Sequence, residues 1–174
     1  MAGKYGNQIF MENRKILIAG GGTGGHLFPA LAIGEEIIKR NSSAQVHYIG
    51  SSFGLEAKVF PIKDVWHTLI PIRGLQRGFN LKGFCRNILL PFRIIKSLIK
   101  TKKLFDDFVP ELIIGTGGYA SAIPLLLALK QKNRVPIILQ EQNSFPGITT
   151  RLFAKRAKLI CIAFKESTES LLNN

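Results

Sequence analysis

The chain has 174 residues, of which 46% are hydrophobic, enough to bury the core of one globular domain. Its 24 Lys and Arg residues against 11 Asp and Glu give a net charge of +13, which favours a nucleic acid, an anionic membrane or a phosphorylated ligand as partner. The two cysteines provide no disulfide framework and fit a reducing cytosol, and neither a signal peptide nor an apolar run of spanning length (about 20 residues) is visible.

Apolar runs typical of strands alternate with helical stretches after an N-terminal segment, 1–13, that we expect to be a flexible tail. The expected strands are 15–20, 45–51, 65–72, 111–115, 135–141 and 158–164. The expected helices are 27–40, 53–60, 81–105, 119–131 and 147–157. This alternation predicts an α/β fold with a doubly wound, Rossmann-like parallel sheet. Because such sheets bind ligands at the carboxyl ends of their strands, the loops 20–26, 115–119 and 141–147 are expected to share one edge.

The first of these loops has the sequence GGGTGGH, from Gly20 to His26, and joins a strand to a helix. Such a turn offers backbone N–H groups and a helix N-terminus to an anion. Its G-x-G-x-x-G pattern fits a dinucleotide site, but the strand 45–51 lacks the acidic residue that would bind the ribose, and no Lys-Ser or Lys-Thr follows to make a P-loop. A tight turn without a ligand remains an alternative. The imidazole of His26 is suited to abstract a proton from a hydroxyl near neutral pH. The simpler alternative is that His26 only caps the helix that begins there.

Of the other two loops, one has a similar glycine-rich sequence and the other contains several polar side chains. The sequence GTGGY, from Gly115 to Tyr119, echoes the first loop directly after another apolar strand. Four polar residues, Gln140 to Asn143, end the next strand. Glu141 is a candidate to orient or assist His26 or to bind sugar hydroxyls, whereas Asn143 could bind a ligand or cap the helix that follows Pro146. Carboxylates and amides at this edge favour a carbohydrate ligand.

A basic amphipathic segment runs from Arg73 to Lys103, with nine basic residues and no acidic one. Helical spacing places one basic stripe on a side opposite to apolar residues. The basic stripe contains Lys82, Arg86, Arg93, Lys96, Lys100 and Lys103, and the apolar side contains Phe84, Ile88, Ile95, Leu98 and Ile99. Pro91 is expected to divide or kink the helix. Two interpretations remain open: a core helix with a solvated basic back, or a surface that docks on anionic lipid. Nucleic acid is disfavoured because no aromatic stacking residues are interleaved with the charges.

In this order the motifs resemble those of the MurG family of peptidoglycan N-acetylglucosaminyltransferases, which are GT-B-fold enzymes of glycosyltransferase family 28. The resemblance covers about residues 14–164. It rests on residues 21–26 with 29–32, Arg73-Gly74-Leu75, Gly117-Gly118-Tyr119, and Glu141-Gln142-Asn143 with Pro146-Gly147. It implies the N-terminal domain of a GT-B fold and an inverting transfer of N-acetylglucosamine from UDP-GlcNAc to lipid I (undecaprenyl-diphosphate-MurNAc-pentapeptide), which gives lipid II. No metal or other cofactor is expected, and the implied location is peripheral, at the cytoplasmic face of the bacterial plasma membrane.

The resemblance also implies roles for individual residues. His26 is expected to be the catalytic base, and Glu141 is the second candidate for a catalytic residue. The expected UDP-GlcNAc contacts are Thr23, Gly24, Gly25 and Asn143, and the expected cleft for the acceptor and its diphosphate is lined by Gly22, Gly117, Gly118 and Tyr119. The expected membrane patch contains Leu81, Lys82, Phe84, Arg86, Ile88, Phe92, Arg93, Ile95 and Lys96.

The sequence departs from the family pattern at three places. Gln140 stands where the family commonly has histidine, and Thr149-Thr150 stands where it often has Thr-Asn. Family members have a second Rossmann-like domain that carries most of the nucleotide-binding groups, whereas this chain ends at Asn174. We therefore expect 14–164 to be the acceptor- and membrane-binding domain and 165–174 to begin the interdomain region.

This N-terminal half alone is expected to bind lipid I or anionic vesicles and to turn over UDP-GlcNAc poorly or not at all. Three alternatives remain: a non-catalytic membrane-recruiting subunit of a split glycosyltransferase, a nucleotide-binding oxidoreductase domain, and, more remotely, a basic nucleic-acid-binding protein.

Overall fold

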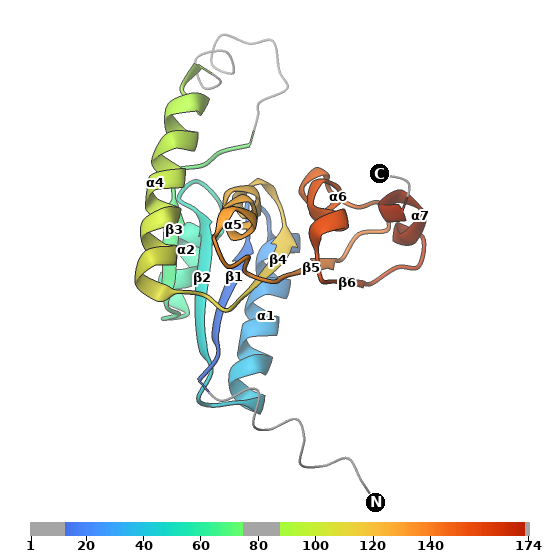
Figure 1. Ribbon diagram of the computed structural model, residues 1–174, viewed down its shortest axis with the longest axis horizontal. Coiled ribbons are helices and arrows are strands. Elements are labelled where there is room, and N and C mark those ends of the chain that lie inside the picture. The colour runs from blue at the N-terminus through green and yellow to red at the C-terminus, as the bar shows by residue number, and fades with distance from the viewer. Residues whose placement is uncertain (1–12, 75–87, 173–174) are drawn as a thin grey trace, which may run out of the picture.

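A six-stranded parallel sheet forms the centre of the computed structural model, which describes residues 13–74 and 88–172 (Figure 1). The strands are β1 (Lys15–Gly20), β2 (Gln45–Ser51), β3 (His67–Ile70), β4 (Leu112–Gly117), β5 (Ile137–Glu141) and β6 (Leu159–Ile162). Their order in the sheet is β3-β2-β1-β4-β5-β6, and every paired strand is parallel to its neighbour. This is the strand order of the Rossmann fold, so the predicted doubly wound α/β sheet is confirmed.

Helices cover both faces of the sheet. They are α1 (Gly24–Arg40), α2 (Glu56–Ile62), α4 (Leu90–Phe108), α5 (Tyr119–Lys130), α6 (Ile148–Phe153) with the 3₁₀ turn η1 (Ala154–Arg156), and α7 (Ser167–Leu172). Strand β1 shows how the two layers arise, because its side chains alternate between the faces. Ile16 and Ile18 pack in the cluster that includes α1 and α2, whereas Leu17 and Ala19 pack in the cluster that includes α4, α5 and α6.

The predicted elements are present with shifted ends. The expected helix 147–157 is divided into α6 and η1, and the expected strand 65–72 is shorter as β3. Pro91 lies in the first turn of α4, where a proline without an N–H group costs no hydrogen bond, and most of the segment that it was expected to divide from α4 lies outside the described residues. The part of the expected helix before residue 88 and the expected tail 1–12 lie outside the described residues.

The central strands β1 and β4 have an irregular pairing at their carboxyl ends. Ala19 pairs with Gly115 and Gly20 pairs with Gly117, so Thr116 is an extra residue, as in a β-bulge. These strands are also where the order reverses, since β2 follows β1 on one side and β4 lies on the other. A crevice for ligands is expected at such a switch point. The bulge therefore lies at the edge where the site was predicted.

Helix α4 turns an unexpected side toward the sheet. Its buried residues are Ser97, Thr101, Leu104, Phe105 and Phe108, while the larger apolar residues near its N-terminus are exposed. Thr101 donates its hydroxyl hydrogen to the carbonyl oxygen of Ser97 at 2.7 Å, which satisfies this polar group inside the core. Figure 1 shows the N-terminal end of α4 extending past the carboxyl ends of the strands. Among the described residues, no helix has the length and apolar content needed to cross a membrane.

Candidate active site

The three predicted loops meet around His26, in the first turn of α1. The Nδ1 atom of His26 lies 3.0 Å from the carbonyl oxygen of Thr116 and 2.7 Å from the side-chain amide of Gln142. These contacts join the loop after β1 to the bulge in β4 and to the end of β5. No described residue bonds Nε2 of His26, and the side chain is partly exposed. The imidazole is therefore held at one nitrogen and open at the other.

Thr116, which the sequence analysis assigned no role, holds His26 through two separate groups. Its carbonyl oxygen faces Nδ1, and its hydroxyl donates to the carbonyl oxygen of His26 at 2.8 Å. Thr116 is completely buried. A side chain at Gly20 would collide with the Thr116 hydroxyl, so the glycine of β1 makes room for this clamp. The signal available in the sequence was the repeated Thr-Gly-Gly motif.

Glu141 does not reach His26. Its buried carboxylate accepts hydrogen bonds from the backbone N–H and side-chain amide of Asn143, at 3.1 and 2.8 Å, and from the N–H of Gly147 at 3.0 Å. The neighbouring Gln142 makes the contact with His26 that was predicted for Glu141. Glu141 instead shapes the loop 141–147.

Asn143 lies on the exposed side of this loop. Its side-chain nitrogen donates to Glu141, and its carbonyl oxygen accepts a hydrogen bond from the Ser167 hydroxyl at 2.7 Å. The alternative that Asn143 caps the next helix is wrong, because α6 has Gly147 as its N-cap and no side-chain cap. The side-chain oxygen of Asn143 remains available to a ligand.

A buried carboxylate, Glu56, lies beneath the first glycine loop and was missed by the sequence analysis. Both of its oxygens lie within 3.0 Å of the N–H of Gly22, and Oε1 also accepts from the N–H of Ser51 at 2.7 Å. A side chain at Gly21 or Gly54 would collide with this carboxylate. The Glu56 carboxylate thus holds the first glycine loop in place, and the N–H of Gly22 is not available to a bound anion. A lone glutamate at the start of a short helix carries no motif that would have revealed this role.

The N–H groups of Gly24 and Gly25 remain open in the part of the chain that is described. Both precede the first backbone hydrogen bonds of α1, which start from His26 and Leu27 to the carbonyl oxygen of Thr23. Open N–H groups at the start of a helix of 17 residues attract an anion. Thr23, Gly24 and Gly25 thus lie where a diphosphate group could be bound, one turn or less from His26.

The second glycine loop packs against the first. Gly118 is the N-cap of α5 with φ of +77°, a conformation that favours glycine, and a Cβ there would collide with the carbonyl oxygen of Gly21. The ring of Tyr119 lies over Gly22, so that a Cβ on Gly22 would come within 2.7 Å of it. Thr149 also donates its hydroxyl hydrogen to the carbonyl oxygen of Gly118 at 3.1 Å. Gly22, Gly118 and Tyr119 therefore lie together, and a Cβ at Gly117 would meet the ring of His26. That these residues line a cleft for the acceptor stays a prediction.

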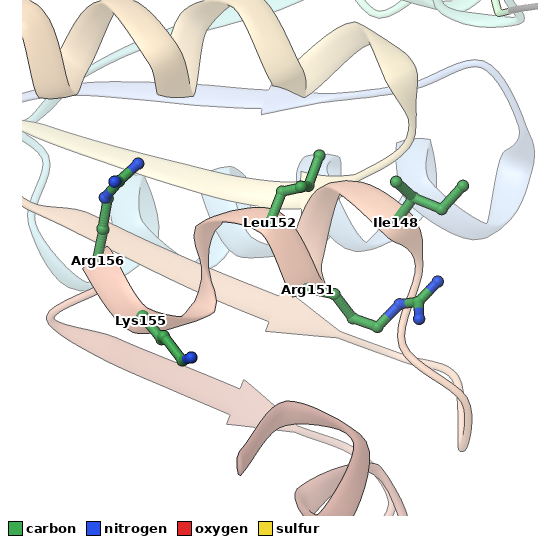
Figure 2. Close-up of a pocket in the computed structure, with 5 residues that line it drawn as sticks. All are labelled: Ile148, Arg151, Leu152, Lys155 and Arg156. Atoms are coloured by element: carbon green, nitrogen blue, oxygen red, sulfur yellow. The ribbon is translucent and has the colours of Figure 1, made fainter. Parts of the chain in front are cut away.

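A basic hollow of about 480 Å³ follows the third loop, along α6 and η1. Figure 2 shows Ile148 and Leu152 on one side of α6 and Arg151 on another, with Lys155 following on η1. Arg151 also lies over the ring of Phe145, at 5.1 Å from its centre. These cations adjoin the site without contacting His26. No group of three or more His, Cys, Asp or Glu residues within 13–74 and 88–172 could hold a metal ion.

The predicted membrane patch is described in part. Leu81, Lys82, Phe84 and Arg86 lie outside the described residues, whereas Ile88, Phe92, Arg93, Ile95 and Lys96 lie at or before the middle of α4. Phe92, Ile95 and Ile99 are 71%, 56% and 66% exposed and follow helical spacing, so they form a stripe that we call the α4 apolar stripe. Helical geometry puts the basic residues beside this stripe rather than opposite to it. The predicted arrangement is corrected accordingly: the side opposite to the stripe is the buried one, with Ser97 and Thr101.

Comparison with known proteins identifies the family. Residues 16–162 match the glycosyltransferase family 28 N-terminal domain. The chain belongs to glycosyltransferase family 28. Membership in family 28 argues against the oxidoreductase alternative.

Relatives in family 28 extend well beyond this domain. The UDP-N-acetylglucosamine--N-acetylmuramyl-(pentapeptide) pyrophosphoryl-undecaprenol N-acetylglucosamine transferase of Chlorobaculum tepidum is 42% identical over 153 residues, which cover 88% of this chain and 42% of the relative. The protein of the same name from Christiangramia forsetii is 38% identical over 160 residues, or 89% of this chain and 41% of the relative. This chain therefore spans about two fifths of the length of these relatives.

The crystal structure of MurG from Acinetobacter baumannii has the same fold. The match covers 88% of this chain and 43% of the Acinetobacter baumannii chain, with a TM-score of 0.72 and 24% sequence identity. The predicted N-terminal Rossmann-like domain of a GT-B enzyme agrees with this match.

Proposed function

We propose that this chain is the acceptor- and membrane-binding half of an N-acetylglucosaminyltransferase that converts lipid I to lipid II. The observation that carries the proposal is the match to relatives whose names state this transfer, at about 40% identity over nearly all of the domain. The geometry around His26 adds support, because a partly open imidazole lies beside the free N–H groups of α1. The donor nucleotide would be held mainly by a second domain, as the family resemblance implies.

In the proposed reaction, Nε2 of His26 takes the proton from the C4 hydroxyl of the MurNAc sugar. The hydroxyl oxygen then forms a bond to the anomeric carbon of N-acetylglucosamine as the bond to the UDP oxygen breaks, which inverts that carbon. The bonding electrons leave with the diphosphate. The N–H groups of Gly24 and Gly25 and the N-terminus of α1 would stabilise diphosphate charge at this edge.

Binding of anionic membranes would bring the chain to its lipid-linked acceptor. Exposed apolar side chains beside cations are typical of helices that lie in the membrane interface. Among the cations of α4, Arg93 lies over the ring of Phe53 at 5.0 Å and Lys100 donates to the carbonyl oxygen of Leu69 at 2.7 Å, whereas Lys96 and Lys103 are exposed. The C-terminal half of α4 packs on the core, but the exposure of Phe92, Ile95 and Ile99 argues against an outer side that is only a solvated basic surface.

A transfer assay tests the proposal. The chain would be assayed with UDP-GlcNAc and vesicles containing lipid I, alone and after fusion to the C-terminal domain of the Chlorobaculum tepidum relative. We expect transfer from the fusion and not from the chain alone, and we expect His26→Ala in the fusion to lower kcat far more than it weakens UDP-GlcNAc binding. Efficient turnover by the isolated chain would contradict the division into two halves, and unchanged kcat in His26→Ala would remove the base role.

A further inference from the structure

The contacts at Nδ1 of His26 restrict where its hydrogen can lie. The carbonyl oxygen of Thr116, 3.0 Å away, can only accept a hydrogen bond. If Nδ1 carried a lone pair, two acceptors would face each other at this distance. With the hydrogen on Nδ1, the imidazole donates to Thr116, and this is the only neutral form that satisfies the contact.

The orientation of the Gln142 amide follows from the same hydrogen. With its nitrogen directed to Nδ1 at 2.7 Å, the amide would oppose one donor to another, and its buried oxygen has no partner. Exchanging the two ends of the amide places the oxygen on Nδ1 and removes the opposition of two donors, and the buried atom without a partner is then the amide nitrogen. The nitrogen and oxygen of an amide are distinguished by such hydrogen-bond networks. Nδ1–H then donates to two oxygens, one from Thr116 and one from Gln142.

We propose that Thr116 and Gln142 hold His26 in the tautomer with hydrogen on Nδ1, which makes Gln142 a positioning residue for the base. The inference rests on the proposed function in one respect: the lone pair on Nε2 is then directed to the open side, where the acceptor hydroxyl would bind. In free histidine the hydrogen prefers Nε2, so these two oxygens reverse the ordinary preference. The orienting role that a carboxylate has in Ser-His-Asp enzymes is filled by two neutral oxygens.

Neutral orienting groups suit this site because its proposed ligands are anionic. A diphosphate beside the N-terminus of α1 already favours a protonated imidazole, which cannot act as a base. A carboxylate at position 142 would add to that effect. The nearest carboxylate on this loop, Glu141, is instead occupied by Asn143 and Gly147. An amide therefore orients the ring without favouring the charged form.

Ring ¹⁵N NMR on the free chain tests the inference without substrate. The chain has three histidines, so selective ¹⁵N labelling and a His26→Gln spectrum assign the His26 signals. At a pH where His26 is neutral, we expect a protonated Nδ1 and an unprotonated Nε2. In Gln142→Met the ratio of the two tautomers should fall about five-fold toward hydrogen on Nε2, as for loss of one net hydrogen bond.

Controls separate these effects from general disruption. Gln45→Met, at the opposite end of the sheet, should leave the His26 signals unchanged, and the signals of His47 and His67 report whether each variant is folded. A hydrogen on Nε2 in the unaltered chain would overturn the inference, as would an unchanged tautomer ratio in a folded Gln142→Met. That result would leave the proposed transferase function intact. Conversely, the expected tautomer together with full activity of His26→Ala would overturn only the base role.

Discussion

Replacing Phe92 by serine should weaken binding of the chain to anionic vesicles about twenty-fold. Complete transfer of a phenylalanine side chain out of water stabilises by about 2.5 kcal/mol. Because Phe92 is 71% exposed, membrane insertion could recover about 1.8 kcal/mol of this, which corresponds to the twenty-fold change. The loss should arise from binding alone, since Phe92 lies on the α4 apolar stripe and outside the core.

The assay is co-sedimentation with vesicles that contain phosphatidylglycerol, at fixed ionic strength. The matched control is Ile62→Ser, because Ile62 is 83% exposed but lies on α2, which covers the other face of the sheet. This control should change the partition coefficient less than two-fold. Equal weakening by both substitutions would show that exposed apolar area, rather than the α4 apolar stripe, determines binding. No weakening by Phe92→Ser would refute the proposed role of the α4 apolar stripe in membrane binding.

Three further predictions concern stability. Burial lowers the pKa of His47 to about 4, with a smaller contribution from His67, so the folded chain resists a proton that the unfolded chain binds near pH 6.5. The free energy of unfolding should therefore fall as the pH drops from about 6.5 through 4. Urea unfolding should show a loss of about 2 kcal/mol between pH 7 and 4.5, and the His47→Gln variant should lose less stability over that interval. Glu56→Gln should cost about 1–3 kcal/mol, because an amide N–H would face the N–H of Gly22 or Ser51, and the exposed Glu36→Gln should change stability by less than about 0.5 kcal/mol. Gly118→Ala should be destabilising by about 2 kcal/mol or more, because φ at Gly118 is positive. Gly25→Ala, in open space in the first turn of α1, should be neutral or stabilising. Equal effects of the two substitutions would contradict the role assigned to φ at Gly118.

The sequence predicted the sheet and the edge where the loops meet, but it could not decide which polar residue faces His26. The alternation of apolar strands and helices was sufficient for the parallel sheet, and the glycine motifs located the loops. Adjacent strand residues point to opposite faces, so a choice between Glu141 and Gln142 depends on the pairing of β5 with β4. That pairing is set by packing across the whole sheet and has no local signal.

The orientation of α4 was unpredictable for a related reason. Hydrophobic periodicity alone would turn Ile95 and Ile99 toward the core, whereas the structure buries Ser97 and Thr101. Leu104, Phe105 and Phe108 anchor the C-terminal half against the sheet, and a continuous helix then fixes the direction of every residue before them. Tertiary packing at one end thus determined the surface exposed at the other.

The extra residue in β4 has a consequence for how the site responds to heat and denaturant. Thr116 is buried in β4 and both of its neighbours, Gly115 and Gly117, pair with β1, so its carbonyl oxygen can move far from His26 only if that pairing is disturbed. Opening of that pairing is the least frequent kind of fluctuation in a sheet, because it requires unfolding of the core itself. The imidazole should consequently keep its orientation up to the global unfolding transition, even while the surface loops around it exchange their hydrogens. Preorganisation of this kind resides in the most stable part of the molecule and requires no substrate to create it.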